Sequence, residues 1–284
     1  MELKQNLCLA VDLDGTLLDS NGKVSEKTLF FLNNEWKRNI IFVTRRNETD
    51  SKRITDQFNP NNNNLYVVFN DGQDIAKIKD DGTYNIIKSF PYIDIDFFNM
   101  FVDWINSKKV NWTIYYREKI VSVINDRSLV GFILVKLLSR KSDIKFIRKE
   151  KLNVLEREQI IKIAINSFKS TSLDRVFVEF INYFGDKVYA VKNDGMIEIK
   201  NKKASKLEAL KYFFRKSSYD WRSSCVYIGN GGNDIECLKY FSNSFAVDNA
   251  IKEAKIAARR ITLSNDDDGV ISALKMVLEE ENGN

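Results

Sequence analysis

Histidine is absent from this chain of 284 residues, and proline and cysteine are scarce, at two and three residues. Without histidine, no mechanism can use an imidazole base, an imidazole metal ligand or a Ser-His-Asp triad. A bound metal would need oxygen or thiolate ligands, and the wide spacing of Cys8, Cys225 and Cys237 favours oxygen. An odd, dispersed cysteine count also argues against a disulfide framework, so we expect a reducing, cytoplasmic location.

Long apolar runs are missing as well. No stretch approaches the roughly 20 residues that a membrane-spanning helix needs, and the first residues lack the pattern of a secretory signal. The chain has 44 basic and 39 acidic residues, and the net charge of +5 is scattered. The basic stretch 141–151 has acids among the bases, which indicates a solvated surface. We therefore expect neither a membrane nor a nucleic acid as partner.

The first and last thirds of the chain alternate short apolar runs with helical patterns. Such alternation predicts an α/β fold with a doubly wound, parallel, Rossmann-like sheet as its core. With 44% hydrophobic and 29% charged residues, the composition is that of a globular protein with a sizeable core. The runs that predict buried strands are 7–11, 40–43, 65–69, 225–228 and 245–247.

The middle of the chain has a less regular pattern, which predicts an inserted α+β domain. We expect residues 1–89 and 191–284 to form the core domain and residues 90–190 to form the insertion. In the insertion, helix-like patterns cover 94–107, 127–138 and 172–184, and strand-like patterns cover 112–116, 120–124, 159–165 and 187–191.

Polar side chains follow the predicted core strands. In an open parallel sheet the ligand crevice lies at the carboxyl ends of the strands, so distant segments deliver these side chains to one place. The residues are Asp12, Asp14, Thr44, Asp71, Asn230 and Asp248.

The sharpest local signal is Asp12-Leu13-Asp14-Gly15-Thr16, directly after the first predicted strand. Residues i and i+2 of an extended chain project to the same side, so Asp12 and Asp14 should face one crevice. Two close carboxylates repel each other, and a divalent cation would relieve that repulsion. The alternative is a surface turn with incidental acids, which the position after a buried strand disfavours.

A second signal is the glycine-rich turn 228–234, which links a predicted strand to a helix. Its glycines allow a ligand to approach the backbone closely. Asn230, Asn233 and Asp234 offer oxygen ligands of the kind that Mg²⁺ prefers. Many such turns are purely structural, so this one is informative because it accompanies Asp12 and Asp14.

Two further residues fit a phosphate site. Thr44 follows a predicted strand and precedes Arg45 and Arg46, so its hydroxyl suits a phosphate oxygen. A helix cap followed by two solvated arginines explains Thr44 equally well. Lys206 lies near a predicted helix start, where a cation is unfavourable unless it faces an anion. Taken alone it reads as a surface lysine, but beside a phosphate it would be the counter-charge.

Together these residues resemble the four motifs of the haloacid dehalogenase (HAD) superfamily of phosphatases. Asp12–Thr16 is similar to the first motif, DxDGT, and Thr44 to the second. Lys206 is similar to the third, and Gly229–Asp234 to the fourth, GDxxND. The stretch after Val247 resembles the closing segment of the Cof-type branch, and the insertion stands where that branch has its type II α/β cap.

The resemblance implies a phosphatase that works through an aspartyl-phosphate, with Asp12 as the nucleophile and Asp14 as the general acid and base. The substrate would be a small phosphorylated metabolite, in this branch most often a phosphosugar. The implied Mg²⁺ and Lys206 are consistent with this chemistry, because a carboxylate approaches a dianionic phosphate only where positive charge is supplied. The implied ligands of Mg²⁺ are Asp12, Asp14, Asn230 and Asp234, and those of the phosphate are Thr44, Arg45, Lys206 and Asn233.

Two residues depart from the family pattern. Arg45 stands where Gly usually follows Thr, so a large cation beside the phosphate site either contacts the substrate or points away. Asn230 stands where the fourth motif has Asp, which removes one negative charge, so we expect weaker Mg²⁺ binding than in a typical member but not its loss. Two other functions stay open: phosphoryl transfer to another sugar, as in mutases of the superfamily, and binding of a phosphorylated ligand without turnover. Retention of both Asp12 and Asp14 disfavours the second. The sequence says nothing about the oligomeric state.

Overall fold

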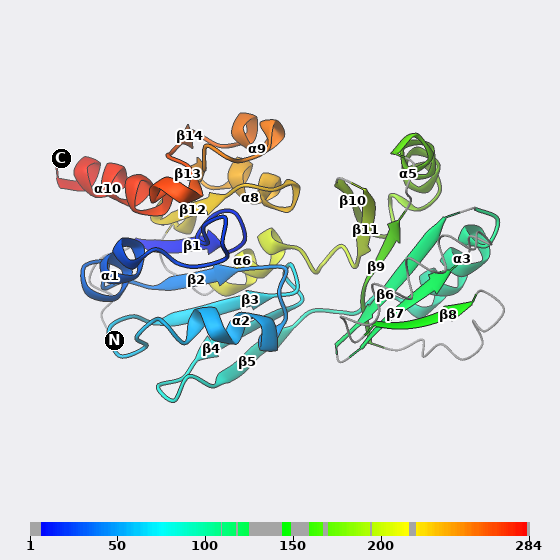
Figure 1. Cartoon of the computed structure of the whole chain (residues 1–284), viewed down its shortest axis with the longest axis horizontal. Helices are drawn as coiled ribbons and strands as arrows, with labels where there is room; N and C mark the ends of the chain where they lie inside the picture. Colours follow the sequence, from blue (N-terminus) through cyan, green and yellow to red (C-terminus); the bar gives the residue numbers. More distant parts are fainter. Residues whose placement is uncertain are drawn as a thin grey trace. The chain divides into compact units, whose positions relative to one another are not determined.

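The computed structural model describes residues 7–108, 110–117, 119–124, 144–148, 159–166, 170–193, 195–215 and 220–282. The chain divides into two compact units. The first comprises Met1–Phe90 with Ser205–Asn284, and the second comprises Pro91–Ala204. Each unit is built on a sheet of its own (Figure 1).

The first unit has an eight-stranded sheet. From β14 to β3 all neighbours are parallel, which confirms the predicted α/β fold with a parallel core. The strands β1, β2 and β12 are buried over their whole length, as a sheet covered on both faces requires. In spatial order the strands are β14 (Arg260–Ile261), β13 (Asn243–Ala246), β12 (Cys225–Gly229), β1 (Cys8–Asp12), β2 (Ile40–Val43), β3 (Leu65–Phe69), β4 (Asp74–Ile78) and β5 (Tyr84–Ser89).

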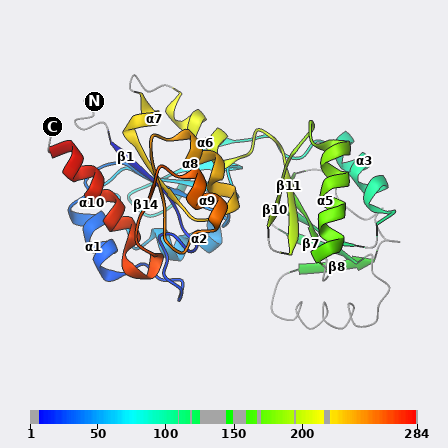
Figure 2. The same ribbon diagram turned by 90° about the horizontal axis from the view of Figure 1, so that it is seen from above.

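Helices cover both faces of this sheet. On one face α1 (Glu26–Asn34) packs beside α10 (Gly269–Asn282), and on the other α6 (Lys206–Phe214) packs beside α8 (Ile235–Tyr240) (Figure 1, Figure 2). Side-chain caps fix where helices begin: the Ser25 hydroxyl accepts a hydrogen bond from Thr28 N at 3.1 Å. The remaining elements of the unit are α2 (Glu48–Thr55), α7 (Trp221–Ser224), α9 (Lys252–Ala257) and the 3₁₀ turns η2 (Gly232–Asp234) and η3 (Asn265–Asp267).

One edge of the sheet is a hairpin that the sequence analysis did not predict. β4 is antiparallel to β3, and β5 is antiparallel to β4. At the tip, Gly82 has a left-handed φ of 74° and donates its N–H to the carbonyl of Lys79 at 2.8 Å. The dipeptide Asp81-Gly82 is a hairpin signal. The sequence analysis missed this hairpin because it expected a helix after every strand.

The second unit packs two helices, α3 (Ile95–Ile105) and α5 (Ser170–Phe184), on one face of a six-stranded sheet (Figure 2). The core between them is rich in aromatic rings, which include Phe101, Phe180 and Trp112. In spatial order the strands are β10 (Tyr189–Asn193), β11 (Met196–Lys200), β9 (Ile160–Asn166), β6 (Asn111–Tyr116), β7 (Ile120–Ile124) and β8 (Ile144–Arg148), antiparallel throughout except for β7 and β8.

The second unit extends past the predicted limit at residue 190. β10 and β11 form a hairpin whose second strand pairs with β9, so the chain returns to the first unit at Ser205. The patterns over 94–107 and 172–184 become α3 and α5, whereas 127–138 lies outside the described residues. Of the basic stretch 141–151, residues 144–148 are described and form β8. No helix in the described ranges has the length and apolar character of a membrane span.

Candidate active site

Three charged side chains meet at the carboxyl ends of β1 and β12. The ammonium of Lys206, the first residue of α6, donates to Asp12 Oδ1 at 2.6 Å and to Asp234 Oδ1 at 2.8 Å. All three are buried, with Lys206 1% exposed and Asp234 0% exposed. When every group is ionised, one cation faces two anions, so the cluster keeps one net negative charge. Such a cluster is costly to bury, which points to a function at this place.

Burial controls the protonation of this cluster. It raises the pKa of Asp12 to about 7 against the lowering effect of Lys206, and the carboxylate of Asp234 adds to the rise. For Lys206, burial acts to lower the pKa, but Asp12 and Asp234 outweigh it and hold the pKa above its ordinary value. Lys206 is thus a permanent cation, whereas Asp12 exchanges a proton near neutral pH.

Asp234 uses all its acceptor positions inside the protein. Its Oδ1 also accepts from the hydroxyl of Tyr227 at 2.6 Å, and its Oδ2 accepts from the backbone N–H groups of Asn230 and Gly231 at 3.0 and 2.9 Å. A carboxylate has about four such positions. This arrangement does not support the predicted role of Asp234 as a direct metal ligand, because its contacts fix Lys206 and the glycine-rich turn instead.

The sequence analysis missed Tyr227. Its ring is buried in β12, and burial and the nearby Asp234 raise its pKa well above the ordinary value, so the phenol stays a neutral donor. The available signal was a tyrosine in an otherwise apolar strand, since a buried phenol needs a hydrogen-bond partner.

Asp14 lies in a different environment from Asp12. Its side chain is 48% exposed, and it receives the guanidinium of Arg46 through Nε at 3.0 Å and Nη2 at 2.5 Å. The Asp14 carboxylate still lies close enough to Asp12 to help raise its pKa, although the chain turns at Gly15, where φ is 74°. Of the two arginines, Arg46 contacts the predicted catalytic residue, whereas Arg45 is exposed.

Thr44 is fully buried at the end of β2. Its hydroxyl accepts from the backbone N–H of Arg46 at 3.1 Å, and its carbonyl accepts from the N–H of Asp71 at 2.9 Å. The cap of α2 is Asn47, whose side chain accepts from Asp50 N at 2.8 Å. The reading of Thr44 as a helix cap is therefore wrong.

The two asparagines of the glycine-rich turn contact different segments. Asn233 donates its Nδ2 to Asp71 Oδ1 at 2.7 Å. The carboxamide of Asn230 lies against Gly15, where an added Cβ would come within 2.4 Å of its Nδ2. Gly15 therefore serves both a left-handed turn and a close approach between the first and fourth motifs.

The oxygen atoms of Asp12 and Asn230 suit Mg²⁺, without the carboxylate of Asp234 that the sequence analysis also predicted as a ligand. Within the described ranges, no three acidic, cysteine or histidine side chains are grouped to hold a metal. Asp12 Oδ2 accepts a hydrogen bond from the hydroxyl of Thr16 at 3.2 Å. The Asn230 amide lies beside Gly15, in the same loop as Thr16. Mg²⁺ needs only one or two protein carboxylates, because water and substrate phosphate complete its shell.

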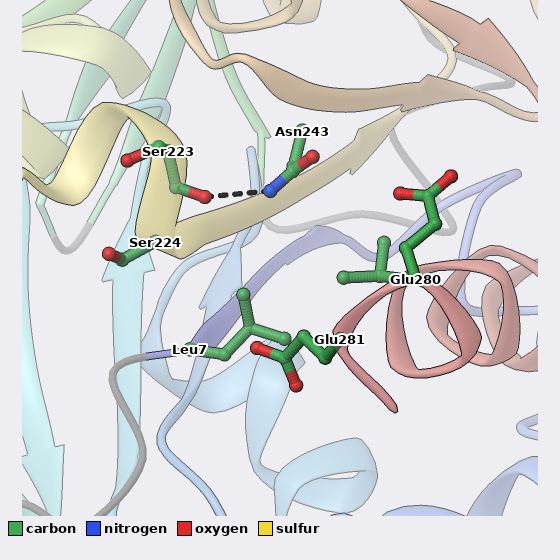
Figure 3. Close-up of a pocket in the computed structure, with 7 residues that line it drawn as sticks. Leu7, Ser223, Ser224, Asn243, Glu280 and Glu281 are labelled. Atoms are coloured by element: carbon green, nitrogen blue, oxygen red, sulfur yellow. Dashed lines mark hydrogen bonds between the residues drawn. The ribbon is translucent and has the colours of Figure 1, made fainter. Parts of the chain in front are cut away.

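A cavity of about 220 Å³ lies at the opposite end of the strands (Figure 3). Leu7, directly before β1, and Asn243, at the start of β13, line it together with Glu280 and Glu281 of α10. Asn243 donates to the carbonyl of Ser223 at 2.7 Å there. Since Asp12 ends β1, this cavity is separate from the Asp12–Lys206 cluster.

The chain belongs to the haloacid dehalogenase-like hydrolase family, whose model matches residues 9–274. This confirms the resemblance drawn from the motifs. A Buchnera aphidicola protein whose name marks it as a candidate phosphatase is 26% identical over 286 residues, covering 96% of this chain and 97% of that protein. Phosphatase YwpJ of Bacillus subtilis is 24% identical over 295 residues, covering 95% of this chain and 99% of that protein.

Solved structures share the fold. A HAD phosphatase from Bacteroides thetaiotaomicron superposes with a TM-score of 0.74 at 19% identity, covering 97% of each chain. A structure described as a HAD subclass IIB sugar phosphatase gives a TM-score of 0.70 at 16% identity, covering 95% of this chain and 98% of that one. These matches confirm the fold class along nearly the whole chain.

Proposed function

We propose that this protein is a Mg²⁺-dependent phosphatase that hydrolyses a small phosphorylated metabolite, with a sugar phosphate as the favoured substrate. The observation that carries the proposal is the buried carboxylate of Asp12, held at 2.6 Å by the ammonium of Lys206 in a chain of the HAD-like hydrolase family. The phosphatase names of the relatives and the sugar phosphatase among the similar structures support the substrate class.

Asp12 is the nucleophile in this proposal. Its oxygen attacks phosphorus, an acyl phosphate forms, and the bond between phosphorus and the leaving oxygen breaks. Water then attacks the phosphorus, orthophosphate leaves, and the carboxylate of Asp12 is restored. Lys206 and Thr16 each hold one oxygen of Asp12, which fixes its direction of attack.

Asp14 is the general acid and base. It gives a proton to the leaving oxygen and later takes one from the attacking water. Its carboxylate is half-exposed and therefore accessible to water, and the two hydrogen bonds from Arg46 fix its orientation. A buried nucleophile and an accessible acid thus divide the work between two nearby residues.

Four residues bind the phosphoryl oxygens in this proposal: Thr44, Arg45, Lys206 and Asn233. When bound, Mg²⁺ supplies positive charge to the phosphoryl group. Asp12, the backbone carbonyl of Asp14 and the carboxamide of Asn230 would hold it, and Asp234 would support them by fixing Lys206.

A phosphate-release screen tests the function. We expect the wild-type protein to release orthophosphate from a sugar phosphate with Mg²⁺, and to stop when a chelator is added. Asp12→Asn should lower kcat by about a thousandfold or more, since it removes the nucleophile.

Nucleotides and pyridoxal phosphate complete the substrate panel. Asp81→Asn, in the hairpin tip, is the matched control that should keep full activity. Activity of Asp12→Asn within tenfold of wild type would refute the assignment, and an isomeric phosphosugar in place of orthophosphate would indicate a mutase.

A further inference from the structure

The turn between β3 and β4, residues 70–73, contacts several of the segments that form the candidate site. The N–H of Asn70 donates to the carbonyl of Arg46 at 3.0 Å, and the N–H of Asp71 donates to the carbonyl of Thr44 at 2.9 Å. These two hydrogen bonds connect the turn to the segment after β2, although the turn belongs to none of the four motifs.

The backbone of this turn is strained. Asn70, Asp71 and Gly72 are consecutive left-handed residues, with φ values of 49°, 57° and 106°. Gly72 adopts this conformation freely, and Asn and Asp tolerate it better than most residues, so the cost lies in two consecutive non-glycine residues, Asn70 and Asp71. Strain of this kind persists where surrounding contacts impose it, and it is concentrated at functional sites.

Gly72 allows the start of α6 to lie against the turn. A Cβ added at Gly72 would come within 2.2 Å of the carbonyl oxygen of Ser205 and 2.9 Å of the backbone nitrogen of Lys206. Ser205 is the cap of α6, since its hydroxyl accepts from Glu208 N at 3.2 Å. The place from which Lys206 reaches Asp12 is therefore set by contact with this turn.

Asp71 fixes the side chain of Asn233 by the 2.7 Å hydrogen bond from Nδ2 to Oδ1. Asp71 is 2% exposed, so this bond is shielded from water. An amide nitrogen carries two hydrogens in one plane, so fixing one of them fixes the direction of the other. An ionised acceptor also makes the bond stronger than a neutral one.

We propose that Asp71 is a positioning residue for phosphate binding, which orients the free N–H of Asn233 toward the phosphoryl group. The proposal rests on the proposed function, in which Asn233 binds that group. Asp71 itself touches neither substrate nor metal, and its turn places Lys206 on the other side of the same site.

Kinetics of two substitutions at Asp71 test this role. Asp71→Ala removes the acceptor, and we expect KM and the inhibition constant of orthophosphate to rise about tenfold, with kcat changed less than threefold. Asp71→Asn keeps an acceptor oxygen and should restore both constants to within about threefold of wild type. Asp81→Ala is the matched control and should change neither. Unchanged constants in Asp71→Ala, or no rescue by Asp71→Asn, would overturn the proposal.

A second variant covers the case in which Asp71→Ala does not fold. Asn233→Ala removes the same hydrogen bond from the other side, and it should raise both constants as Asp71→Ala does. In the double variant the two effects should add to less than their sum, because both substitutions remove the same hydrogen bond; fully additive effects would contradict this.

Failure of the proposed function is distinguishable from failure of this role. If the wild-type protein hydrolyses no ester, calorimetric titration with orthophosphate still tests Asp71. Tenfold weaker binding in Asp71→Ala would support the role, whereas equal binding, or no binding by wild type, would overturn it.

Discussion

Asp12 and Asp14 are two positions apart in the sequence, yet the protein buries the first and leaves the second half-exposed. Asp12 is held by Lys206, and Asp14 is held by Arg46 at the surface. Local sequence predicted both carboxylates but not this division, because it depends on partners from α6 and from the segment after β2. The sequence analysis named no cationic partner for Asp14, because the contact with Arg46 depends on the segment after β2.

The buried position of Asp12 links stability to pH. Burial raises its pKa to about 7 in the folded protein, whereas an aspartate in the unfolded chain titrates near 3.8. The folded state therefore binds this proton more tightly. The stability contributed by the proton is fully present below about pH 4 and is lost as the pH rises to about 7.

Denaturant unfolding of the metal-free protein measures this linkage. Between pH 5 and pH 8 we expect wild type to lose a few kcal/mol of unfolding free energy relative to Asp12→Asn, which cannot ionise at this position. The difference between the two proteins removes the contribution of every other titrating group. Parallel pH profiles would show that Asp12 is ionised throughout this range.

At the level of helices and strands, the apolar runs were sufficient to predict β1, β2, β3 and β12, because buried parallel strands are apolar on both faces. The β4–β5 hairpin was missed although Asp81-Gly82 signals it. The roles of Tyr227 and Asp71 could not be predicted, since each depends on a partner in the turn after β12. Periodicity indicates which face of an element is buried, but not which side chains meet across elements.

The turn after β12 gives a test at this scale. A Cβ at Gly229 would lie 2.6 Å from Cγ of Asp234, so Gly229→Ala must displace the carboxylate that holds Lys206. We expect a loss of roughly 1–3 kcal/mol in stability from overpacking, together with lower kcat. Thermal unfolding and phosphate release measure the two effects.

Gly22→Ala is the control for that substitution. No atom lies within 4 Å of the added Cβ, but φ is 72°, so it should cost stability of about 1–2 kcal/mol through the backbone alone and leave kcat unchanged. Equal melting temperature and kcat in Gly229→Ala and wild type would refute the crowding argument.

Across the whole molecule, the two points where the chain leaves and re-enters the first unit are attached to adjacent residues. Gln73 accepts the N–H of Phe90 at 2.8 Å through its backbone carbonyl and donates its side-chain amide to the carbonyl of Phe90. The neighbouring residue, Gly72, packs against Ser205. Residues 91–204 therefore begin and end near one turn.

This arrangement predicts that the first unit folds without the second. In a variant that joins Phe90 to Ser205 through a short Gly-Ser linker, we expect a cooperative thermal transition, because none of the eight strands of the first sheet is lost. Circular dichroism during heating measures it. A gradual, non-cooperative change would mean that the two units depend on each other for folding.

The order of the chain has a consequence for its synthesis on the ribosome. β1 pairs with β12, where Cys8 lies opposite Cys225, and Lys206 follows Asp12 by 194 residues. A nascent chain thus carries an apolar strand with one open edge, and a carboxylate without its counter-ion, until after the whole insertion has been translated. Such a strand invites aggregation, so newly made chains of this protein should depend on chaperones more than the finished fold does.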